Sequence, residues 1–181
     1  MRRLYYALTF SQEATNKIIT NVNILKDNAL QIKPIPDNSI HMTMAFLGEV
    51  EESMIDELLE IRDEISFEPF SFNLDYLDSF PDRNSRLYYL GTNQSEELYA
   101  LQKSLVKKLY QHKIAFHDRQ FLPHVTLSRK TVLKKEPKML LPINCTITSL
   151  ELLESIPYKE TRIGIPVKKN SESRIESRNW K

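Results

Sequence analysis

The chain has 181 residues, of which 41% are hydrophobic and 27% charged, and these shares exclude a disordered or fibrous protein. Its 25 Lys and Arg residues nearly balance 24 Asp and Glu residues, so no overall positive field would draw it onto nucleic acid or an anionic membrane. We expect a cytoplasmic monomer without membrane contact, because no apolar run approaches the ~18 residues of a span, no signal peptide is evident, and a lone Cys145 suits a reducing compartment.

The first half of the chain predicts alternating strands and helices. Residues 3–10 mix aromatic and aliphatic side chains as a buried strand does, and Ser11 can cap a following helix whose apolar residues recur every three or four positions. Beyond the proline-containing break at 33–38, residues 39–47 predict a second strand. A second helix, with Met54, Leu58, Ile61 and Ile65 directed inward, follows acidic residues that favour a helix start.

The second half restarts the same order. Its clearest element is a helix in which four leucines form one stripe, with acidic residues at its start and basic residues at its end. Shorter strands are expected at residues 70–77, 87–90, 125–127, 143–153 and 161–167. The pattern predicts an α+β protein with a duplicated unit, forming a single domain over 1–167, followed by a polar tail at 168–181.

Two short segments share one formula: histidine, apolar residue, threonine, apolar residue. They are His41-Met-Thr43-Met and His124-Val-Thr126-Leu. On a strand, side chains two residues apart share a face, so each segment would present an imidazole beside a hydroxyl and turn its apolar pair to the core. By composition, such a repeat would arise by chance in about one chain in two thousand. A single such segment is more often a core histidine beside a strand threonine, but the repeated pair favours a shared site.

These segments resemble the two motifs of the 2H phosphoesterase superfamily, and specifically its bacterial RNA 2′,3′-cyclic phosphodiesterase family (LigT-like, "2′-5′ RNA ligase"). The segments that open the chain (RLYYALTFS) and that begin at Arg86 (RLYYLGT) are similar to the same family. The resemblance implies a bilobal fold of two β-α-β-α-β units, with antiparallel sheets facing a central cleft and helices outside. It also implies an enzyme that hydrolyses terminal 2′,3′-cyclic phosphates of RNA to 2′-phosphomonoesters, with reversible 2′-5′ ligation.

The chemistry of the residues agrees with that implication. Opening a cyclic phosphodiester requires a base that takes a proton from water and an acid that protonates the leaving oxygen, and histidine serves as either near neutral pH. By the family pattern, His41 is the proton donor and His124 the proton acceptor. Thr43 and Thr126 would bind the phosphate, and Arg129, just after the second motif, would add a contact to it. No metal or other cofactor is expected.

The chain also departs from the family pattern. Leu122 stands where relatives often have an arginine, and the segment after Glu154-Ser155 lacks the usual glycine and aromatic residue. Tyr158 there could stack a base, but an exposed loop tyrosine is the simpler interpretation. His112 and His117 belong to no repeated motif, and we expect structural roles for both.

One further pattern and the nature of the motifs bear on the expected substrate. Four lysines after the second motif could guide an RNA strand or simply form a solvated loop: Lys130, Lys134, Lys135 and Lys138. The motifs read phosphate geometry and not a base, so the expected substrates are RNA ends or small cyclic nucleotides. The alternatives are another cyclic nucleotide phosphate, a 2′-5′ oligoadenylate, or a module that binds RNA ends without catalysis.

Overall fold

The computed structural model describes residues 1–169 and contains three α-helices, two short 3₁₀ turns and ten strands. The helices are α1 (Gln12–Asp27), α2 (Ile55–Glu64) and α3 (Glu96–Gln111), and the 3₁₀ turns are Asp37–Ser39 and Glu52–Met54. The strands are β1 (Arg2–Leu8), β2 (Ala29–Pro34), β3 (Met42–Val50), β4 (Phe70–Leu74), β5 (Tyr76–Asp82), β6 (Ser85–Gly91), β7 (His124–Leu133), β8 (Ile143–Ile147), β9 (Glu151–Tyr158) and β10 (Thr161–Pro166).

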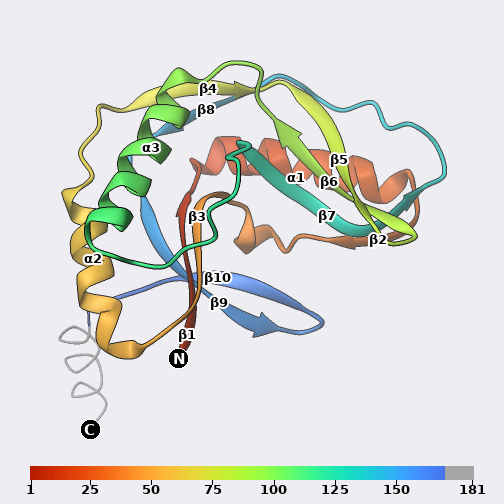
Figure 1. Cartoon of the computed structure of the whole chain (residues 1–181). Coiled ribbons are helices and arrows are strands. Elements are labelled where there is room, and N and C mark those ends of the chain that lie inside the picture. The colour runs from red at the N-terminus through yellow and green to blue at the C-terminus, as the bar shows by residue number, and fades with distance from the viewer. Residues whose placement is uncertain (170–181) are drawn as a thin grey trace, which may run out of the picture.

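The strands form two four-stranded sheets and a two-stranded ribbon, and every pairing is antiparallel. The first sheet has the order β10-β9-β1-β3, and the second has the order β2-β7-β6-β5. The ribbon pairs β4 with β8. In Figure 1 the first sheet runs through the lower part of the view and the second lies at the upper right; α2 and α3 lie at the left, and α1 overlaps the second sheet, against which it packs. The predicted α+β class with antiparallel sheets is confirmed.

A strand-helix-strand unit occurs once in each half of the chain. β1 leads into α1 and pairs with β3, whereas β6 leads into α3 and pairs with β7. Each helix packs on the other half's sheet: α1 lies against β7, and α3 lies against β3. The halves are less alike beyond this unit, because α2 follows β3 while only strands follow β7 within residues 1–169. Because each of these helices packs on the sheet of the other half, the two lobes, one built on each four-stranded sheet, share one core.

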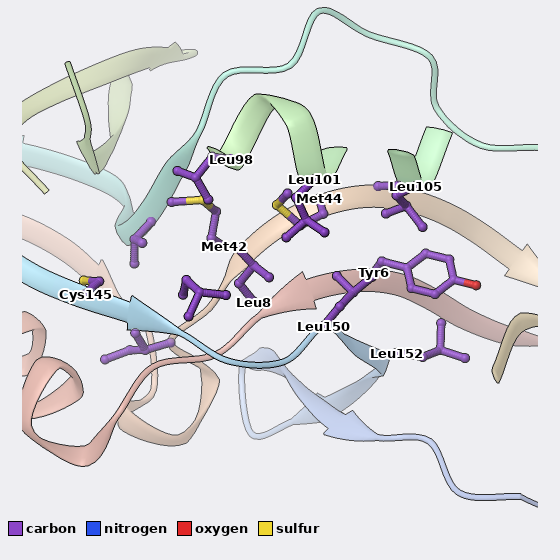
Figure 2. Close-up of a cluster of buried hydrophobic side chains, with 14 of the residues drawn as sticks. Tyr6, Leu8, Met42, Met44, Leu98, Leu101, Leu105, Cys145, Leu150 and Leu152 are labelled. Carbon is purple, nitrogen blue, oxygen red and sulfur yellow. The ribbon is translucent and has the colours of Figure 1, made fainter. Parts of the chain in front are cut away.

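The packing of the core determines which side chains of the two motif strands, β3 and β7, are buried. Met42 and Met44 of β3 are buried beneath the leucine stripe of α3, as Figure 2 shows. All four leucines predicted for that stripe are buried: Leu98, Leu101, Leu105 and Leu109. Val125 and Leu127 of β7 are also fully buried. Burying each such side chain stabilises the fold by about 1.5–3 kcal/mol, so both motif strands are held in one orientation.

Several boundaries differ from the sequence predictions. The strand β2 was not predicted, because its half-buried residues show no alternation and its pairing with β7 is irregular. The strand predicted at 39–47 begins at Met42, since a 3₁₀ turn occupies Asp37–Ser39. The single strand predicted at 70–77 is divided between β4 and β5, which belong to different sheets. The predicted cap of α1 is confirmed, because the Ser11 hydroxyl accepts a hydrogen bond from a backbone amide of the first turn.

Cys145 is fully buried on β8, as expected of a small strand residue, and burial raises the pKa of its thiol to about 12. None of the helices in residues 1–169 has the length and hydropathy needed to cross a membrane. Residues 170–181, most of the predicted polar tail, lie outside the described residues.

Asn21 fastens the segment before β8 to α1. Its side chain is fully buried, donates to the carbonyls of Lys17 and Leu140, and accepts from the Leu140 amide at 2.8 Å. We expect Asn21→Ala to lower the free energy of unfolding by about 2 kcal/mol, because it removes all three hydrogen bonds of a buried side chain. Urea denaturation measures the loss. Asn23→Ala, at an exposed position of the same helix, is the matched control for helix propensity and should not destabilise.

Candidate active site

The two histidine-threonine pairs have the same local geometry. On β3 and just before it, His41 and Thr43 are half-buried, whereas the intervening Met42 is fully buried. His124 and Thr126 of β7 repeat this alternation. The strands belong to different sheets but lie against each other. The predicted alternation is therefore observed at both motifs.

Each imidazole is held by the carbonyl two residues before it. Nδ1 of His41 lies 2.7 Å from the Ser39 carbonyl oxygen, and Nδ1 of His124 lies 2.7 Å from that of Leu122. A carbonyl oxygen can only accept, so Nδ1 carries the proton in both rings and Nε2 is left for a ligand. The side chain at position 122 has no part in this contact, which the Leu122 backbone makes.

A tyrosine packs against each ring. The Tyr5 ring centroid lies 5.0 Å from that of His41, and the Tyr89 centroid lies 5.3 Å from that of His124. Burial raises the pKa of Tyr5 to about 12, and it also raises the pKa of Tyr89. Both tyrosines therefore stay neutral near neutral pH and fix the rings by packing.

A cavity of about 510 Å³ opens between the two lobes at His41. Its wall includes Thr43 and Arg129 but not His124 or Thr126. His124 is nonetheless close enough for its charge to act on His41. The hydroxyls of Thr43 and Thr126 make no hydrogen bond to any residue of the described chain, so both can donate to a ligand.

The cavity wall is strongly basic. It contains five cationic side chains from four strands: Arg3, Lys33, Arg129, Lys130 and Arg162. Two acidic residues also line it, Asp82 and Glu160. None of these cations forms an ion pair with a carboxylate within residues 1–169. Unpaired cations in a concave site attract an anion such as phosphate.

The environment lowers the pKa of both histidines. Burial is the main cause at His41, and the positive charges of His124 and Arg129 add to it, while the hydrogen bond to Ser39 acts in the opposite direction. Burial and the Arg129 charge lower the pKa of His124, opposed by its bond to Leu122. Because charge on one imidazole disfavours charge on the other, a state with one ring protonated and one neutral is favoured over a doubly charged pair.

These shifts predict how stability depends on pH. A histidine whose pKa is lower in the folded than in the unfolded chain binds fewer protons when folded, so stability is lost as pH falls below the ordinary value of 6.5. We expect the free energy of unfolding to drop between pH 7 and pH 5, with a slope of at most about 1.4 kcal/mol per pH unit for each histidine. Urea denaturation across this range measures it. The double variant His41→Gln, His124→Gln should flatten this slope. An unchanged slope would contradict the lowered pKa of the two histidines.

The remaining candidates lie outside the cavity. His112 ends α3 and lies 3.0 Å from a Glu57 carboxylate oxygen of α2, and His117 packs edge-on against Phe46. Tyr158 is the last residue of β9 rather than a loop residue; it is 39% exposed and does not line the cavity. No cluster of three His, Cys, Asp or Glu side chains that could hold a metal ion occurs within residues 1–169.

Several cavity residues were not predicted from the sequence. Arg3 and Tyr5 lie two residues apart on β1 and both line the cavity, but the continuous apolar run of that strand has no alternation that could have identified them. Phe46 lies under the Arg3 guanidinium, whose carbon is 4.9 Å from the ring centroid. Lys33 reaches across to the carbonyl of Glu160 in the β9–β10 turn, a contact that no local pattern indicates.

The chain is similar in sequence to proteins named RNA 2′,3′-cyclic phosphodiesterase. A segment of 110 residues, 60% of the chain, is 32% identical to an RNA 2′,3′-cyclic phosphodiesterase of Archaeoglobus fulgidus and covers 60% of that protein. A segment of 130 residues, 70% of the chain, is 28% identical to the protein of the same name from Thermotoga maritima and covers 69% of it. The chain thus spans about three fifths to two thirds of the length of these relatives.

Solved structures and a family model extend the likeness. A crystal structure of E. coli LigT complexed with 3′-AMP superimposes with a TM-score of 0.76 and 25% identity, over 92% of this chain and 95% of that one. The model of the 2′-5′ RNA ligase superfamily matches residues 16–156, which include both histidine-threonine motifs. Because this match extends over most of the chain, the chain belongs to the 2′-5′ RNA ligase superfamily.

Proposed function

We propose that this protein is an RNA 2′,3′-cyclic phosphodiesterase that forms a 2′-phosphomonoester by acid-base catalysis with two histidines. The observation that carries the proposal is the repeated geometry of His41 and His124, each with Nδ1 bound to a carbonyl and Nε2 left for a ligand. Relatives named RNA 2′,3′-cyclic phosphodiesterase support the substrate. The basic cavity supports an anionic ligand.

The proposed reaction assigns one proton transfer to each ring. Nε2 of His124 takes a proton from water, whose oxygen attacks phosphorus opposite the 3′ oxygen of the ribose. The bond from phosphorus to that 3′ oxygen breaks, and protonated Nε2 of His41 donates its proton to it. The product carries a 2′-phosphate and a 3′-hydroxyl. The two imidazoles supply both proton transfers, so the proposed reaction requires no metal ion.

The phosphate contacts follow from the neighbouring side chains. We place the hydroxyls of Thr43 and Thr126 on the non-bridging phosphate oxygens, where charge accumulates in the transition state. Arg129 adds its guanidinium to the same group, since it lines the cavity and acts electrostatically on both histidines. Because acid and base exchange roles in the reverse direction, the same residues would serve 2′-5′ ligation of RNA ends.

The test uses an oligoribonucleotide that ends in a 2′,3′-cyclic phosphate, with EDTA present throughout. Purified protein should convert the end to a 2′-phosphomonoester, which is distinguished from the 3′ isomer by chromatography against standards. Absence of turnover would overturn the proposed activity. A 3′-phosphate product would overturn the proposed direction of ring opening. Loss of turnover in EDTA, restored by a divalent cation, would overturn the metal-independent mechanism.

A further inference from the structure

Strand β7 contains a bulge directly after the second motif. Against both of its neighbours, β2 and β6, three residues of β7 are spanned by two residues of the partner strand in the region of Arg129 and Lys130. Lys130 has φ of 48°, in the left-handed region that non-glycine residues rarely adopt. Bulges of this kind redirect side chains and are frequent near active sites.

A buried hydroxyl pair holds this bulge in place. Thr131 donates from Oγ1 to the Arg129 carbonyl at 3.1 Å, so the 2.7 Å contact with Ser128 must use the Ser128 hydroxyl as donor. Ser128 is 0% exposed and Thr131 is 1% exposed. From β2, the Gln31 side chain donates to the Lys130 carbonyl at 3.1 Å. The unusual backbone is therefore supported by specific hydrogen bonds within β7 and from β2.

The bulge changes which way two cations face. Consecutive residues of a regular strand point to opposite faces of the sheet, but Arg129 and Lys130 both line the cavity beside His41. Lys130 also lines a second cavity of about 580 Å³, which shares Asp82 with the first. Lys130 thus lies where the two cavities meet.

The second cavity has the composition of a phosphate subsite. Besides Lys130, it is lined by Arg83 and Asn84 of the β5–β6 turn, where Arg83 has φ of 53°. Neither Arg83 nor Lys130 forms an ion pair with a carboxylate of the described chain, although Asp82 lines both cavities. Two cations facing one acidic residue leave a positive balance for an anionic group.

We propose that this second cavity binds the phosphodiester on the 5′ side of the terminal nucleotide, through Arg83 and Lys130. The enzyme would then select the end of an RNA strand over a free cyclic mononucleotide. This inference rests on the proposed function, because it takes the cyclic phosphate to lie beside His41 and Thr43. The other three lysines after the second motif line neither cavity, so Lys130 alone of that group acts on the strand.

The test compares adenosine 2′,3′-cyclic phosphate with a trinucleotide that ends in the same cyclic group. The parent protein should show a kcat/KM for the trinucleotide at least about tenfold higher, equivalent to one additional charge-assisted contact. Arg83→Gln should lower the trinucleotide value about fivefold more than the mononucleotide value, and should reduce the slope of log kcat/KM against log salt by about 0.7. Lys130→Gln should act in the same direction, with Lys130→Arg restoring the preference. Lys103→Gln, an exposed lysine of α3, should change neither value.

The outcomes separate this inference from the proposed activity. Turnover of both substrates at equal kcat/KM, or a trinucleotide preference that survives Arg83→Gln and Lys130→Gln, would overturn the second subsite while leaving the activity intact. If no turnover occurs, fluorescence anisotropy with the 2′-phosphorylated mononucleotide and trinucleotide decides the matter. Tighter binding of the trinucleotide that Arg83→Gln abolishes would support the subsite, and equal affinities would overturn it.

Discussion

Replacing either His41 or His124 by alanine is expected to lower kcat by roughly 10²–10⁴-fold, the usual contribution of a general acid or base. The physical reason is that each ring supplies one proton transfer from a fixed Nε2, because its Nδ1 is held by a backbone carbonyl. Steady-state kinetics on a cyclic-phosphate oligonucleotide measures the loss. The double variant should lose little more than the worse single variant, since the two residues act together.

His112→Ala is the matched control for this experiment. That histidine lies outside the cavity and interacts with Glu57 on α2, so its removal should leave kcat near the parent value. Substantial turnover that survives both active-site substitutions would contradict the two-histidine mechanism. So would a kcat/KM that rises monotonically to pH 9, because one acid and one base predict a bell-shaped profile. The lowered pKa of both histidines predicts that the acidic limb lies below pH 6.5.

The roles of the two rings can be separated with a modified substrate. Sulfur in place of the bridging 3′ oxygen makes a leaving group that departs without protonation, so loss of the general acid matters less. We expect this substrate to restore much of the activity of His41→Ala and little of that of His124→Ala. The reverse result would exchange the assigned proton donor and acceptor and would leave the site itself unchanged.

Removing a threonine hydroxyl is expected to have the next largest effect. Thr43→Val or Thr126→Val should lower kcat by roughly 10²-fold each, because each substitution removes a hydrogen-bond donor from the developing charge on phosphate. Valine keeps the volume and the β-branch of threonine, so the strands should be preserved. Circular dichroism and urea denaturation check the fold, and kinetics on the same oligonucleotide measures the activity.

Serine provides the control at both positions. Thr43→Ser and Thr126→Ser keep the hydroxyl and should remain within a few-fold of the parent protein. If valine and serine reduce kcat equally, the threonines act through packing and not through phosphate. An effect confined to Thr43 would indicate that only this threonine, which lines the cavity, contacts the ligand.

Much of the fold could be predicted because local patterns and burial agree. The four leucines of α3 recur at helical spacing and all four are buried, and Ser11 caps α1 as its position indicates. Alternation at His41 and at His124 also predicts which side chains face outward. Strand β2 was not predicted, because it is a half-buried edge strand whose side chains show no regular alternation and whose pairing with β7 is irregular.

By itself, the sequence determined the two histidine-threonine pairs, their outward orientation and the class of chemistry that they can perform. These features depend on the period of a strand and on the chemistry of imidazole, and both are local. Only the tertiary structure decided which cations surround the site, because Arg3, Lys33 and Arg162 reach it from β1, β2 and β10. The second cavity at Lys130 likewise depends on a bulge, which arises from the registers of three strands distant in sequence.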